Sequence, residues 1–171
     1  MPITLHANGK IEGINNSNFN NSLAAGHVLQ TVYSHTESTA ALAYNETWSL
    51  LQTSITPIST SSSILVMVTL GLTSTDSTAD VGFDILRDST ALQQGSGGTA
   101  NATTGAFMNQ GNGTAFNSNV ILLDDEISTT SQVTYKIRAN ANNPRQLIIN
   151  KRGSDDALRT QSRMTLMEIK G

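Results

Sequence analysis

The stretch SILVMVTLGL, residues 63–72, decides the fold. Successive side chains of a β-strand point to opposite sides, and the even-numbered positions from Ile64 to Leu72 are all apolar. The odd-numbered positions between them are Leu65, Met67, Thr69 and Gly71. A strand with two largely apolar faces is typical of the middle of a sheet that is covered on both sides. The stretch therefore predicts a central strand that needs cover on each face.

Other segments alternate between apolar and polar residues, as half-buried strands do. Val133, Tyr135 and Ile137 are separated by Thr134 and Lys136, which indicates a strand with one polar face. Val81, Phe83 and Ile85 alternate in the same way with Gly82 and Asp84, which predicts that Asp84 lies on a polar outer face. In all, the pattern predicts eight strands, over 28–35, 46–56, 63–73, 80–87, 115–124, 131–140, 145–151 and 161–170.

Helical patterning is scarce. The best helical candidate is short, Ser38 to Leu42, and we predict a loop there. Many short strands separated by Ser, Thr, Gly, Asn and Asp indicate an all-β sandwich or barrel. Eight strands suit a jelly-roll-like antiparallel β-sandwich, and we expect it over residues 28–171, preceded by an arm over residues 1–27.

The arm has the pattern of a small hairpin followed by an Asn-rich linker. Asn8-Gly9 suits a two-residue type I′ turn, in which both central residues have positive φ. A hairpin of this size is marginally stable alone, so we expect it to dock on its own domain or on a neighbouring subunit. The apolar side chains that would bind the partner are Ile3, Leu5, Ile11, Ile14 and Phe19.

A second irregular stretch, Gln93 to Gly113, is Gly-rich and almost uncharged, with one apolar pair at Phe107-Met108. It predicts a long surface loop or a weak extra strand. A contact loop is the functional alternative, since loops on rigid β scaffolds often carry recognition.

Composition excludes several classes of protein. The net charge is −3, so there is no electrostatic case for a nucleic-acid partner. The chain has no cysteine, which excludes disulfides, thiolate metal sites and cysteine nucleophiles. The longest apolar run, Ile64 to Val68, is too short to span a membrane, and the N-terminus lacks the pattern of a secretory signal.

The sequence offers little chemistry. His6, His27 and His35 have no metal-ligand spacing, and no cofactor-binding motif occurs. Asp124-Asp125-Glu126 is a candidate cation site, although a polar turn after an apolar strand is the simpler interpretation. We therefore predict no metal, no cofactor and no catalytic residues, and a protein that is not an enzyme.

One pair of aromatic side chains is a candidate for stacking on a sugar ring. Tyr44 and Trp48 flank a three-residue polar segment. A tryptophan beside Leu50 and Leu51 is more often part of the core, and we favour that interpretation.

Five segments in combination resemble a known family. They are GHVLQTVYSHT (26–36), SLLQTSITPISTSSSILVMVTLGL (49–72), FDILRDSTAL (83–92), SQVTYKIRANANN (131–143) and MTLMEIKG (164–171). Together they resemble small virion proteins of tailed phages, especially phages of marine and freshwater bacteria. The resemblance covers about residues 28–171. Ser63 departs from it, because many members carry Lys there, and so does the short N-terminal part, where related domains often follow a long fibre shaft.

The resemblance implies a jelly-roll-like domain that forms a homotrimer on the outside of a virion. We expect a capsid decoration, or cement, protein that binds the major capsid protein and stabilises the head, because the arm is long enough to anchor and too short for a shaft. The alternative is a tail-fibre or spike protein that recognises host surface polysaccharide. The sequence leaves capsid or tail, host and copy number open.

Overall fold

The computed structural model consists of β-strands, without helices, over the residues that it describes: 4–5, 11–12, 23–74, 80–94, 103–108, 116–141, 146–152, 155 and 157–171. Two short strands, β1 (Thr4–Leu5) and β2 (Ile11–Glu12), pair with each other. The main body contains β3 (Val28–Thr36), β4 (Ala40–Leu42), β5 (Thr47–Ile55), β6 (Ser63–Ser74), β7 (Asp80–Arg87), β8 (Thr90–Ala91), β9 (Gly105–Met108), β10 (Phe116–Asp124), β11 (Val133–Ala141), β12 (Leu147–Ile149) and β13 (Ser162–Ile169).

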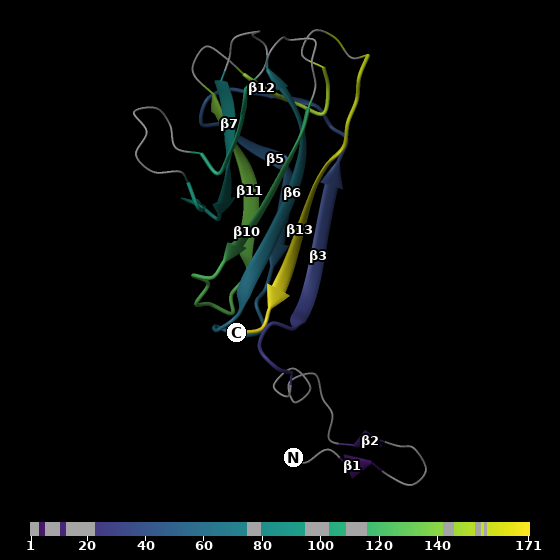
Figure 1. Ribbon diagram of the computed structural model, residues 1–171, viewed down its shortest axis with the longest axis vertical. Helices are drawn as coiled ribbons and strands as arrows, with labels where there is room; N and C mark the ends of the chain where they lie inside the picture. Colours follow the sequence, from purple (N-terminus) through teal and green to yellow (C-terminus); the bar gives the residue numbers. More distant parts are fainter. Residues whose placement is uncertain are drawn as a thin grey trace.

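The first sheet has β6 in its middle. The strand β10 pairs along one side of β6, and β13 pairs along the other, with β3 beyond it (Figure 1). Leu72 of β6 lies opposite both Phe116 and Ile149, so β12 continues the β13 side of the sheet and carries β4 at its outer edge. The central position predicted for residues 63–72 is confirmed.

A glycine allows the change of neighbour along β6. Just before β13 begins, the chain passes close to Gly71, and a Cβ at position 71 would overlap the Thr160 hydroxyl. Asn150 N–H donates to the Gly71 carbonyl (2.9 Å), and the Ser162 hydroxyl bonds the Asn150 side chain (2.7 Å). The close approach of these two segments of the chain therefore requires a residue without a side chain at position 71.

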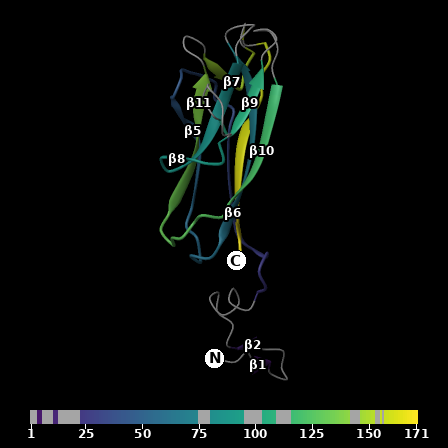
Figure 2. The ribbon, with the colours of Figure 1, turned by 60° about the vertical axis from the view of Figure 1, so that its left-hand side comes forward.

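The second sheet has the order β5-β11-β7, with β8 and β9 both pairing the outer side of β7 (Figure 2). Its inner face carries the predicted alternation, because Val133, Tyr135, Ile137 and Ala139 are all buried. These side chains pack against Val66, Val68 and Met164 of the first sheet in one hydrophobic core.

The all-β sandwich is therefore confirmed, and the eight predicted strands lie within two residues of β3, β5, β6, β7, β10, β11, β12 and β13. Without the short strands β4, β8 and β12, the two sheets have the orders β3-β13-β6-β10 and β5-β11-β7-β9. Most connections cross from one sheet to the other, and we interpret this order as the double Greek key of a jelly roll.

Three local predictions are wrong. Residues 40–42 lie in the segment predicted as a loop but form β4, because β12 offers Leu147 as a partner and Leu42 is buried. In the arm, Leu5 pairs with Ile11, one residue out of the register that a regular two-residue turn at Asn8-Gly9 gives. Asp84 is buried rather than exposed, since Arg138 and Gln94 cover its carboxylate.

The Gly-rich stretch is settled in part. Within Gln93 to Gly113, residues 105–108 form β9, which places Phe107 opposite Val81 of β7. The predicted weak strand is thus confirmed for these four residues. Thr104 precedes β9 and donates to the Leu92 carbonyl (2.7 Å), which attaches this segment to the end of β8.

Candidate functional site

The outer face of the first sheet carries an apolar patch. We use this term for Leu65 and Met67 of β6, Ile121 and Leu123 of β10, and Met167 of β13. The register sets Ile121 opposite Met67, and Leu123 opposite Leu65, which in turn faces Met167. Ile121 is 69% exposed and Leu123 42%, while Leu65, Met67 and Met167 are half-buried.

No charged side chain interrupts these two rows. Across the sheet, the first row continues from Met67 to Thr165 and Tyr33. The second row continues from Met167 to Thr31. The sequence predicts that both faces of residues 63–72 are covered, yet in the part of the chain that the structure describes only the inner face is fully buried. Exposed apolar rows without a charged side chain are typical of an interaction surface.

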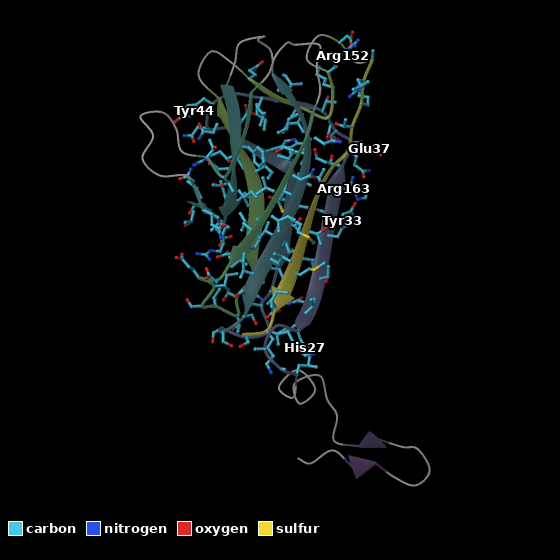
Figure 3. The ribbon with its side chains drawn as sticks, in the orientation of Figure 1. His27, Tyr33, Glu37, Tyr44, Arg152 and Arg163 are labelled. Atoms are coloured by element: carbon cyan, nitrogen blue, oxygen red, sulfur yellow. The ribbon has the colours of Figure 1, made fainter. Side chains whose placement is uncertain are left out.

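The polar part of the same face lies along β3 and β13. The rings of Tyr33 and His35 stack with their centroids 5.4 Å apart, and Tyr33 is 53% exposed. Arg163 stands directly opposite His35 in the register. Figure 3 shows Tyr33, Arg163 and Glu37 following one another along this side of the molecule. We call Tyr33, His35 and Arg163 the aromatic strip.

An open hollow of about 510 Å³ continues the strip beyond the end of β3. It is lined by Glu37, Arg159, Thr160 and Gln161. The Gln161 amide donates to the Glu37 carboxylate (3.2 Å), so the hollow presents planar side chains that both donate and accept hydrogen bonds.

At the candidate cation site, Asp124-Asp125-Glu126, the first carboxylate is hydrogen-bonded to other side chains. One oxygen of the buried Asp124 carboxylate accepts from Arg87 (2.6 Å), and the other accepts from the Tyr135 hydroxyl (2.7 Å). Burial, and then this hydrogen bond, raises the pKa of the Tyr135 phenol. The described residues contain no group of three His, Cys, Asp or Glu side chains that could hold a metal ion. Asp124 therefore acts as the partner of the half-buried Arg87 and the buried Tyr135.

A second buried carboxylate ties the end of the chain to a loop. Glu168 of β13 accepts hydrogen bonds from the Ile58 N–H (2.8 Å) and from the Gln30 amide (2.6 Å). Lys170 bonds the start of the domain, since its N–H donates to the His27 carbonyl (2.8 Å) and its carbonyl accepts from Gly26 (2.7 Å). These contacts join the closing segment of the chain, residues 164–171, to the segments around residues 26–30 and 55–61.

The remaining predicted residues are distributed as follows. Leu5 and Ile11 pair across β1 and β2, whereas Ile3, Ile14 and Phe19 lie outside the described residues. Trp48 is buried in the core, as we favoured, and Tyr44 is exposed, so they form no stacking pair. The aromatic strip cannot be recognised in the sequence, because only the antiparallel register of β3 and β13 brings Arg163 beside His35.

Comparisons with known proteins add no identification. Neither the models of known protein families nor the curated proteins contain a match to this chain. Within the described parts of the chain, no helix is long and apolar enough to cross a membrane.

Proposed function

We propose that this protein is a structural component of a phage virion, a capsid decoration protein that binds the outer surface of the head as a homotrimer. The observation that carries the proposal is the apolar patch. Ile121 and Leu123 expose apolar side chains to water on the outer face of the first sheet, and a second copy of the chain would cover them. In a closed symmetric ring, the apolar patch of every copy would be covered in the same way by its neighbour.

The resemblance of the five segments to phage virion proteins supports the location on a virion. The contacts of Glu168 give that resemblance a physical basis. Two of the segments, around residues 55–61 and 164–171, are hydrogen-bonded to each other through this one carboxylate. A protein with the same fold would need both segments to make these hydrogen bonds, so their joint presence supports the resemblance.

The major capsid protein is the proposed partner, and the N-terminal arm is the proposed contact. The arm carries Ile3, Leu5, Ile11, Ile14 and Phe19. One arm alone binds weakly because of the entropic cost of association, but three arms of one trimer act together and raise the apparent affinity.

Copy number tests the location. We expect hundreds of copies per virion, from quantified gel bands of purified particles, and density over the capsid faces in electron micrographs. A few to tens of copies, with density at the tail, would favour the second candidate, a tail-fibre or spike protein. The aromatic strip is the observation that favours this candidate.

Truncation tests the role of the arm. Leu23 marks the place to cut, because its carbonyl accepts a hydrogen bond from the Lys170 ammonium (2.5 Å) and the segment after it contacts the sandwich. We expect a chain beginning at Leu23 to fold and trimerise, yet fail to bind phage particles that lack the protein. If it decorates them as well as the full chain does, the sandwich itself carries the capsid-binding surface.

A further inference from the structure

The aromatic strip exposes three functional groups that the fold does not use. Among the described residues, the Tyr33 hydroxyl, the His35 ring nitrogens and the Arg163 guanidinium have no hydrogen-bond or ion-pair partner. The inner face of the same strands supplies the packing, through Val32 and Met164. The exposed rings and the unpaired guanidinium, on a chain with only ten Lys and Arg residues, are therefore available to a ligand.

The strip and the hollow form one continuous surface. Alternate residues of an extended chain share a face, so Tyr33, His35 and Glu37 follow one another on the outer side. The run from Tyr33 to Glu37 spans about 13 Å at the rise of a β-strand. Gln161 reaches Glu37 from the neighbouring segment, and the hollow of about 510 Å³ opens there. A surface of this length and shape accepts a short chain molecule rather than a single small ion.

The side chains select the chemistry of that molecule. The stacked rings offer an apolar π-face to the C–H groups of a pyranose ring. The Glu37–Gln161 pair offers planar acceptors and donors, which suit neighbouring hydroxyl groups. Arg163 presents the planar fork that binds a carboxylate through two parallel hydrogen bonds. Glu37 and the net charge of −3 disfavour a nucleic acid.

We infer that the aromatic strip and the adjoining hollow bind an acidic oligosaccharide. Its pyranose rings stack on Tyr33 and His35, and a sugar carboxylate pairs with Arg163. The inference does not depend on the proposed function. The most exposed residues of the apolar patch, Ile121 and Leu123, lie on β10, whereas the strip lies on β3 and β13.

Calorimetric titration of the full chain with tri-galacturonate, and with its uncharged methyl ester, tests the inference. We expect Tyr33→Ala to weaken binding of both ligands at least tenfold. Arg163→Gln should weaken binding of the acid by a similar factor and leave the ester unchanged. Tyr44→Ala and Lys136→Gln are the controls, because Figure 3 places Tyr44 away from the strip and Lys136 lies on β11 of the other sheet, and both variants should bind as the unaltered chain does.

Two results would overturn the inference. One is the absence of binding of either sugar at millimolar concentration. The other is equal loss in the control variants and in the strip variants. Tyr33 and Arg163 are exposed, so melting temperatures should stay unchanged and loss of binding can be separated from loss of fold. Chemical-shift changes at the amides of residues 33–37 and 159–163 would locate the bound sugar independently.

Discussion

Tyr135 places a hydroxyl inside the sandwich and donates it to Asp124 of the opposite sheet. Arg87 approaches the same carboxylate at its other oxygen, so one acid neutralises a half-buried cation and satisfies a buried phenol. Because ionised Tyr135 would stand in an apolar core beside Asp124, its pKa in the folded protein lies above the value of about 10 in the unfolded chain.

This difference predicts a loss of stability in alkali. Below about pH 10 the phenol is protonated in both states, and its contribution to stability is complete. Above that pH only the unfolded state releases the proton, so the free energy of unfolding falls by about 1.4 kcal/mol per pH unit. We expect Tyr135→Phe to remove this part of the slope in urea unfolding between about pH 9 and about pH 11. Parallel curves for the two proteins would contradict the assignment.

At the scale of the element, the closing strand β13 is held by its buried Glu168. Its carboxylate reaches across to the loop between β5 and β6 and accepts the backbone N–H groups of Ile58 (2.8 Å) and Ser59 (3.3 Å). Removing the acceptor leaves both donors of the loop without this partner, in addition to the Gln30 amide.

We expect Glu168→Ala to cost about 3 kcal/mol of unfolding free energy, since hydrogen bonds to charged groups each contribute about 1.5–3 kcal/mol. Glu46→Ala is the control, because that exposed carboxylate accepts a single backbone bond from Ala43 and its loss should cost about 1 kcal/mol or less. Urea unfolding measures both values, and amide exchange should quicken at Ile58 and Ser59. Equal costs for the two variants would show that Glu168 does not hold the loop.

The long strands could be predicted because their alternation is local. Val133 to Ala139 shows its buried face directly in the sequence, and the structure agrees. The short strands could not, since Ala40–Leu42 is extended only because β12 lies beside it. The burial of Asp84 could not be predicted for the same reason, because only the register of β7 and β11 brings Arg138 opposite it. The candidate site also depends on register, because neither Ile121 nor Arg163 shows its neighbours in the sequence.

At the scale of the whole molecule, the first sheet of the sandwich has apolar side chains exposed on its outer face. The apolar patch joins three strands, β10, β6 and β13, that the sequence places far apart. A face of this kind on a monomer in water favours association, and a closed ring limits the association to a defined number of copies.

The most direct test of this assembly is the molar mass in solution, measured by light scattering at micromolar concentration. We expect a mass three times the 18.2 kDa of one chain. Ile121→Lys should fold normally, since the side chain is 69% exposed, but lower the mass to that of one chain. Leu50→Lys is the matched control on the opposite sheet, with 54% exposure, and should remain trimeric. A mass near 18.2 kDa for the unaltered chain would contradict the assembly through the apolar patch.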